Sequence, residues 1–141
     1  MSIFTDKKEL GKAGEDVSCI YLEQIGYRII ERNFMCRQGE IDIVAKDKDE
    51  YVFIEVKTRS NLNFGRPKDA VNEPKQKHIY KSTRFYLYLH NLNNAFVRFD
   101  VIEVYFFNNR YKLKHLKQVE IKRKINNKGR FLSPAINIKI L

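Results

Sequence analysis

Two short segments place carboxylates and a lysine among apolar residues at strand-like spacing. The first segment begins Glu40-Ile41-Asp42, and the second contains Glu55-Val56-Lys57. Successive side chains of a strand point to opposite faces, so Glu55 shares a face with Lys57, and Glu40 shares one with Asp42. Carboxylate oxygens are ligands for Mg²⁺, and a lysine beside them can stabilise developing negative charge. The pattern therefore indicates a metal-dependent site for phosphodiester chemistry.

The polar residues 47–50 between these segments predict a β-hairpin. If the turn is symmetric, paired residues have numbers that sum to 97, and Asp42 lies opposite Glu55. Their Cβ atoms would then be about 5 Å apart, and the two charges would repel by about 3 kcal/mol at an effective dielectric near 20. A divalent cation, Mg²⁺ or Mn²⁺, would offset that repulsion. The alternative is an exposed hairpin face with cross-strand ion pairs.

The elements around the hairpin predict an α/β domain. Asp6 followed by Glu9 is typical of a helix start, and Gly26 of a helix end, so we expect a helix over about residues 6–25. Asn72 can cap a second helix, for which we expect four inward residues, Ile79, Phe85, Tyr86 and Leu89. Strands are expected at 27–37, at both segments of the hairpin, at 95–107 and at 110–119. Asn108-Asn109 favours a tight turn.

Composition restricts the partners. The 141 residues carry a formal net charge of +10, which favours a polyanion, most simply nucleic acid. Neither a signal peptide nor a membrane span is evident, and Cys19 and Cys36 form no metal-ligand spacing, so we expect a cytoplasmic protein without a membrane partner. We expect one domain over residues 1–118 and a basic, then apolar, extension over 119–141. In that extension Ile136, Ile138 and Ile140 alternate, as in a short strand or a docking segment.

Five motifs together resemble the uncharacterised YraN-like family. They are Gly11-Lys12-Ala13-Gly14-Glu15, Tyr27-Arg28-Ile29-Ile30-Glu31-Arg32-Asn33-Phe34, Gly39-Glu40-Ile41-Asp42-Ile43-Val44, Phe53-Ile54-Glu55-Val56-Lys57-Thr58-Arg59 and Arg98-Phe99-Asp100-Val101. That family is similar to the PD-(D/E)XK nuclease superfamily, near the Holliday-junction resolvases. The resemblance covers about residues 9–118 and implies a restriction-endonuclease-like core, a mixed central β-sheet flanked by α-helices.

The same resemblance implies site residues. Asp42, Glu55 and Lys57 would form the catalytic triplet, with Asp42 and Glu55 as metal ligands and Glu15 as a further acidic member. Periodicity places Glu15 off the apolar stripe of its helix. It reaches the site only if the cleft lies beside that helix, and otherwise it is a surface charge. Asp100 is interpreted as part of a structural ion pair, with a site role as the less favoured alternative, and no metal or nucleophile partner is evident for His115.

Basic residues near the triplet predict a nucleic-acid interface, with DNA favoured over RNA. They are Arg59, Arg66 and Lys68 after the second strand of the hairpin, and Lys77, Lys81 and Arg84 on one face of the second helix. Three functions remain open. The first is a metal-dependent endonuclease, with branched DNA as one candidate substrate. The others are a module that binds nucleic acid without cutting it and a protein-interaction domain that uses its basic tail.

Overall fold

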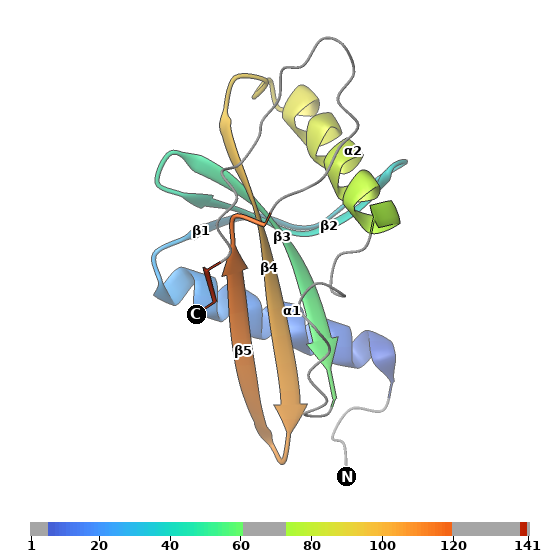
Figure 1. The fold of residues 1–141 in the computed structure, drawn as a ribbon, viewed down its shortest axis with the longest axis vertical. Coiled ribbons are helices and arrows are strands. Elements are labelled where there is room, and N and C mark those ends of the chain that lie inside the picture. Colours follow the sequence, from blue (N-terminus) through green and yellow to red (C-terminus); the bar gives the residue numbers. More distant parts are fainter. Residues whose placement is uncertain (1–5, 61–72, 120–138, 141) are drawn as a thin grey trace.

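The structure, a computed structural model, describes residues 6–60, 73–119 and 139–140. Within these ranges the chain forms two helices and six strands (Figure 1). In chain order they are α1 (Lys7–Gln24), β1 (Arg28–Cys36), β2 (Gly39–Asp47), β3 (Glu50–Arg59), α2 (Glu73–Leu89), β4 (Phe96–Phe107), β5 (Arg110–Lys117) and β6 (Lys139–Ile140). No helix of the described residues has the length and apolar character needed to cross a membrane.

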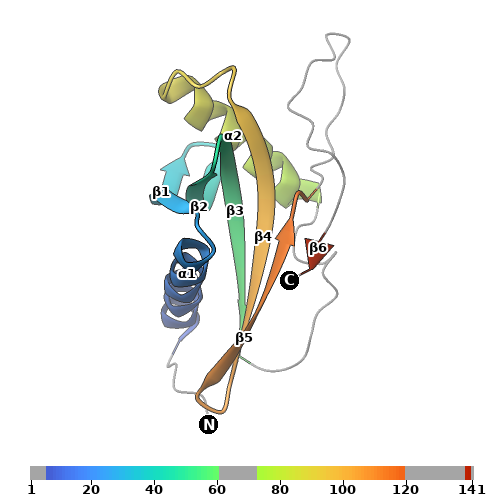
Figure 2. The same cartoon turned by 90° about the vertical axis from the view of Figure 1, so that its left-hand side faces the viewer.

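The strands form one mixed sheet in the order β1-β2-β3-β4-β5-β6. The neighbours pair antiparallel except β3 and β4, which are parallel and are connected through α2. Figure 2 shows β3, β4 and β5 running side by side as the long centre of this sheet. The expected mixed sheet with flanking helices is therefore confirmed.

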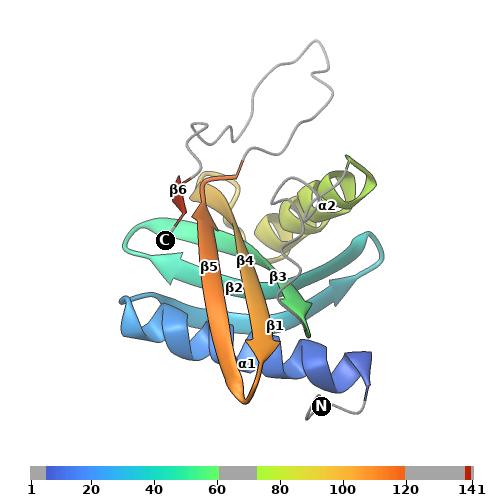
Figure 3. The ribbon, with the colours of Figure 1, turned by 60° about the horizontal axis from the view of Figure 1, so that its bottom comes forward.

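The two helices cover opposite faces of the sheet, and each has its own core. On the α1 face, Leu22 packs with Ile43 and Ile54. On the α2 face, Tyr86 packs with Phe34 and Phe53. Figure 3 shows α1 lying along β1 and β2. Because both faces are covered, the central strands are apolar on both sides, and any polar side chain they bury needs a specific reason.

The ends of α1 follow its sequence signals. The Asp6 carboxylate accepts a hydrogen bond of 2.7 Å from the Glu9 backbone N–H, which caps the first turn. At the other end Gly26 adopts a φ of 98°, and the Tyr27 N–H bonds the Leu22 carbonyl. This closure is the one that a left-handed glycine permits after a helix. The first predicted helix is therefore confirmed.

The buried face of α2 differs in part from the prediction. Ile79 and Tyr86 are buried as expected, whereas Phe85 and Leu89 are exposed. Their places are taken by the small residues Ser82 and Thr83 and by Leu87, which are all buried. Small side chains let the helix approach the β1–β2 hairpin closely. The proposed cap, Asn72, lies outside the described residues.

A buried polar network lies at the β4–β5 end of the sheet. The Asp100 carboxylate, 1% exposed, accepts hydrogen bonds from the Arg98 guanidinium and contacts His115 Nε2 at 2.7 Å. His115 Nδ1 in turn lies 2.9 Å from the Tyr21 hydroxyl of α1. The predicted structural ion pair of Asp100 is confirmed. His115, for which no metal or nucleophile partner was expected, belongs to this structural network, and its partners come from β4 and α1, far away in the sequence.

The chain after β4 turns as expected. Asn108 and Asn109 have φ values of 48° and 58°, the left-handed turn that asparagine tolerates, and β5 follows. Near the C-terminus, β6 pairs antiparallel with the end of β5, Ile140 opposite Leu116. Of the two alternatives for this segment, a short strand is therefore present at its end.

Candidate active site

The β2–β3 hairpin has the predicted register, and its ladder ends beside the candidate site. Asp47 pairs with Glu50 and Ile43 with Ile54, so the numbers of each pair sum to 97. The backbone pairing of β2 with β3 stops at Ile43–Ile54, one residue before Asp42 would lie opposite Glu55. The two strands therefore cease to be joined by regular backbone pairing at the point where the acidic residues begin.

The Asp42 side chain replaces the missing backbone partner. Its Oδ2 accepts a hydrogen bond of 2.8 Å from the Val56 backbone N–H. Backbone N–H groups of a strand point within the plane of the sheet, toward the neighbouring strand. The Asp42 carboxylate therefore lies at the edge of β3, at the residue that separates Glu55 from Lys57, and not on the reverse side of the sheet.

A change of face in β1 and β2 explains this position. Ile41 belongs to the α2-side core and Ile43 to the α1-side core, although residues two apart in a regular strand share a face. In β1, Asn33 has a φ of 53°, a left-handed conformation that asparagine tolerates better than most residues. Asn33 lies at the level of Asp42, because the flanking pairs are Arg32–Ile43 and Phe34–Ile41. The local twist turns Asp42 out of both cores and toward β3.

Glu15 of α1 lies close to Asp42. Its helix approaches β3 tightly, because a Cβ atom added at Gly14 would lie only 2.0 Å from Thr58 Oγ1. The pKa of Glu15 is raised above its ordinary value by burial and then by the negative charge of Asp42, while a hydrogen bond from Asn33 acts in the opposite direction. Glu15 is therefore near enough to Asp42 for their charges to interact, and its role in the site stays a prediction.

Glu55 lies on the α2 side of the sheet and is only 7% exposed. It lines a small pocket. The other lining residues are mostly apolar: Ile41, Phe53, Ile54, Ile79, Phe99, Asp100, Val101 and Val119. Burying a carboxylate is unfavourable unless it is paired, hydrogen bonded or coordinated, so packing alone does not account for an acid here.

Lys57 has an acidic neighbour that the sequence did not indicate. In the parallel β3–β4 ladder Lys57 is paired with Glu103, which is 3% exposed and accepts a hydrogen bond from the Tyr105 hydroxyl. Burial and this carboxylate raise the pKa of Tyr105 to about 12. On its other side Glu103 pairs with Lys114 of β5. A parallel pairing across a helical crossover has no local sequence signal, so Glu103 could not be predicted.

The donor atoms at the gap between β2 and β3 are carboxylate oxygens, the ligands that Mg²⁺ and Mn²⁺ prefer. Glu15 approaches from the α1 side, Glu55 lies on the α2 side, and Asp42 lies between them. Among residues 6–60, 73–119 and 139–140, no three acidic, histidine or cysteine side chains are grouped so that they could hold a metal ion. Asp42 and Glu55 supply two carboxylates, and Mg²⁺ commonly takes one or two carboxylates from a protein and completes its shell with water and phosphate.

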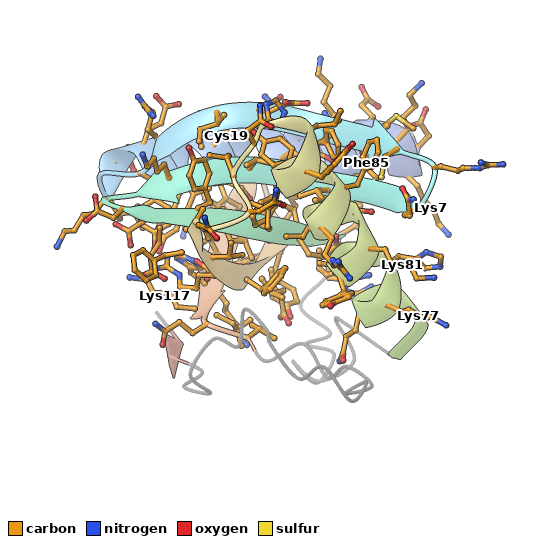
Figure 4. All side chains as sticks on the ribbon, turned by 90° about the horizontal axis from the view of Figure 1, so that it is seen from above. Lys7, Cys19, Lys77, Lys81, Phe85 and Lys117 are labelled. Atoms are coloured by element: carbon orange, nitrogen blue, oxygen red, sulfur yellow. The ribbon has the colours of Figure 1, made fainter. Side chains whose placement is uncertain are left out.

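The predicted basic residues fall into two groups. Lys77, Lys81 and Arg84 are exposed on α2, and Figure 4 shows the two lysines pointing away from the sheet. The Arg84 guanidinium lies 6.0 Å from the centre of the Tyr80 ring. Arg59 is exposed at the end of β3, whereas Arg66 and Lys68 lie outside the described residues.

The fold defines an α/β protein whose central hairpin opens at Asp42, beside the strand that carries Glu55 and Lys57. The chain belongs to the uncharacterised protein family UPF0102, whose model matches residues 14–104. A UPF0102 protein of Clostridium botulinum is 47% identical over 113 residues, which are 78% of this chain and 92% of that protein. One of Caldicellulosiruptor saccharolyticus is 43% identical over 100 residues, 71% of this chain and 85% of that protein. The expected family is confirmed.

Among solved structures, the chain is similar to the Pyrococcus furiosus SfsA structure in complex with Ca²⁺, with a TM-score of 0.37 and 15% sequence identity. The match covers 79% of this chain, and it spans 63% of the length of that structure.

Proposed function

We propose that this protein binds nucleic acid and hydrolyses phosphodiester bonds with the help of Mg²⁺ or Mn²⁺. The observation that supports it most directly is the position of the Asp42 carboxylate on the Val56 N–H, between Glu55 and Lys57. An acidic side chain that takes over a backbone position in a sheet is held in a fixed place, as a ligand site requires. The resemblance of the sequence to the PD-(D/E)XK nucleases, which implies the triplet Asp42, Glu55 and Lys57, agrees with this arrangement.

Each residue of the candidate site would have a separate role. Asp42 and Glu55 would hold the cation, with Glu15 as a further acidic group. When bound, the cation would neutralise charge on the phosphate and lower the pKa of a coordinated water. Lys57 would orient the attacking water or stabilise the charge that develops on the phosphate oxygens. Its register neighbour Glu103 would help to position the lysine, because the two side chains carry opposite charges on adjacent strands.

The test is cleavage of branched, single-stranded and duplex DNA, and of matching RNA, in the presence of Mn²⁺. Wild type is compared with Asp42→Asn and Lys57→Met, which remove the charges but keep similar volumes. We expect cleavage by wild type alone, and DNA to be cut in preference to RNA. Cleavage that survives both substitutions would rule out this site.

The nucleic-acid surface is proposed to include Arg59 and the exposed cations of α2. Each phosphate contact that is lost should reduce the slope of log affinity against log salt by about 1. We therefore expect Lys77→Gln and Lys81→Gln to weaken binding and to flatten this slope. Lys117, which lies away from α2 in Figure 4, provides the control substitution Lys117→Gln, for which the slope should not change. Equal slopes for all three variants would contradict the assignment of this face.

A second candidate is a module that binds nucleic acid without cutting it. The observation in its favour is that the acidic residues of the described part do not form a ready three-ligand group. This candidate gives the same salt dependence but no cleavage with any divalent cation, and its binding is unaffected by Lys57→Met. The cleavage experiment therefore separates the two.

A further inference from the structure

Arg32 of β1 connects the sheet to two adjacent acids of α1. Its Nη2 atom donates a hydrogen bond of 2.7 Å to Asp16 Oδ1 and lies 3.8 Å from Glu15 Oε1. The hydrogen bond to Asp16 is the main reason why the pKa of Arg32 is raised. The guanidinium is therefore engaged mainly by Asp16, and Glu15 receives only the longer and weaker attraction.

Asn33, the next residue, contacts Glu15 from the level of Asp42. Its side chain hydrogen bonds to the Glu15 carboxylate. Its left-handed backbone conformation lies between the Arg32–Ile43 and Phe34–Ile41 pairs, which places it opposite Asp42 on β2. Asn33 thus lies at the change of face that turns Asp42 out of both cores, and its side chain also binds Glu15.

The charge balance of this group is unusual for a structural ion pair. The Arg32 guanidinium, bonded to Asp16 at 2.7 Å, stays 3.8 Å from Glu15, and Asn33 contacts Glu15 from the level of Asp42. The Glu15 side chain is 18% exposed, so it is partly shielded from water on this side of the sheet. If the only role of Arg32 were to attach α1 to β1, the bond to Asp16 would be sufficient, and Glu15 would not have to face another carboxylate.

We propose that Arg32 and Asn33 are positioning residues that hold the Glu15 carboxylate beside Asp42 without neutralising it, so that the two carboxylates form the acidic wall of the cation site. This inference rests on the proposed function and adds two residues to it. Outer residues that orient metal ligands change metal affinity by roughly 10–100-fold when they are lost, although they do not touch the metal. Arg32 and Asn33 would orient Glu15 in this way.

The test measures the Kd for Mn²⁺ by isothermal titration calorimetry, without nucleic acid. Asn33→Gly keeps the left-handed backbone accessible and removes only the side chain. We expect it to weaken Mn²⁺ binding by about 10-fold or more, within the range for outer residues. Arg32→Gln should also weaken binding, and Arg32→Lys should restore it in part. The melting temperature of each variant without metal shows that the fold is retained.

A second arm distinguishes positioning from a general structural effect. In a Glu15→Gln background, Asn33→Gly should cause no further loss of Mn²⁺ affinity, because the carboxylate that it orients is already absent. A Kd for Asn33→Gly equal to that of wild type, or a full additional loss in the Glu15→Gln background, would overturn the positioning roles and leave the proposed function intact. Absence of Mn²⁺ binding by wild type would overturn both.

Discussion

The bond between Asp42 and the Val56 N–H has two roles that can be separated by mutation. Asp42→Ala removes the acceptor and the charge, whereas Asp42→Asn keeps a carbonyl oxygen for the Val56 N–H and removes only the charge. If Asp42 both joins β2 to β3 and binds a cation, the two variants should be equally inactive but unequally stable.

The magnitudes follow from the 2.8 Å bond, which is partly buried. A hydrogen bond to a charged group contributes about 1.5–3 kcal/mol, and a donor left without a partner loses about 1–3 kcal/mol. We expect Asp42→Ala to lower the free energy of unfolding by about 2 kcal/mol. Asp42→Asn should stay within about 1 kcal/mol of wild type, because a neutral bond remains and the repulsion of Glu15 is relieved.

The assay is urea unfolding followed by circular dichroism, together with Mn²⁺ titration calorimetry on the same samples. Asp42→Asn is the decisive variant, because its loss of Mn²⁺ binding cannot be attributed to unfolding. If Asp42→Ala were as stable as wild type, the bond to Val56 would not join the strands. If Asp42→Asn bound Mn²⁺ as tightly as wild type, the carboxylate would not be a ligand.

Three further predictions concern residues around the site, and urea unfolding measures all of them. Gly14→Ala should lower the free energy of unfolding by about 1–3 kcal/mol, because the added methyl would meet Thr58. Gly11→Ala on the same helix meets no atom within 4 Å and should be neutral or stabilise by up to about 1 kcal/mol, so equal effects of the two would refute the close approach of α1 to β3. Glu15→Gln should stabilise the metal-free protein at pH 7 but not near pH 4. The raised pKa of Glu15 means that its favourable contribution is present below about pH 4.3 and is lost as pH rises through the folded-state pKa, so a difference independent of pH would contradict its place beside Asp42. Asp100→Asn should destabilise by about 2–3 kcal/mol, since it removes the buried carboxylate that binds both Arg98 and His115, although Asp47 still pairs with Arg98. Burial alone would raise the pKa of Asp100, but hydrogen bonds from His115 and Arg98 hold it below its ordinary value. Its contribution is therefore present above about pH 3.9 and is lost as pH falls through the lower folded-state pKa, and an acid transition shared by wild type and Asp100→Asn would refute this role.

Local signals were sufficient for most of the fold. The α1 helix was predicted from an N-cap and a terminal glycine, and the β2–β3 register from the symmetry of a short turn. Both features depend on residues that are close in the sequence, and their physics is local. The buried face of α2 was predicted less well, because the small side chains of Ser82 and Thr83 matter only once the opposing hairpin is in place.

Partners far apart in the sequence could not be predicted in the same way. His115 finds Asp100 through the β4–β5 pairing and Tyr21 through the packing of α1. Glu103 becomes the neighbour of Lys57 only because β3 and β4 run parallel in one particular register. Alternation along a strand says which face a residue occupies, but it does not say which strand will lie beside it.

The position of Asp42 shows why regular alternation was both a useful guide and an incomplete one. Continued pairing would have placed Asp42 directly opposite Glu55 on one face, whereas the left-handed Asn33 turns β1 and β2 and brings Asp42 to the edge of β3. A carboxylate on a face would leave the strands joined by their backbones and could be removed without affecting the sheet. A carboxylate in the ladder is fixed by the sheet and also holds it together. The site and the fold then share one residue, and this is why the Asp42→Ala and Asp42→Asn variants must be compared before any loss of activity is interpreted.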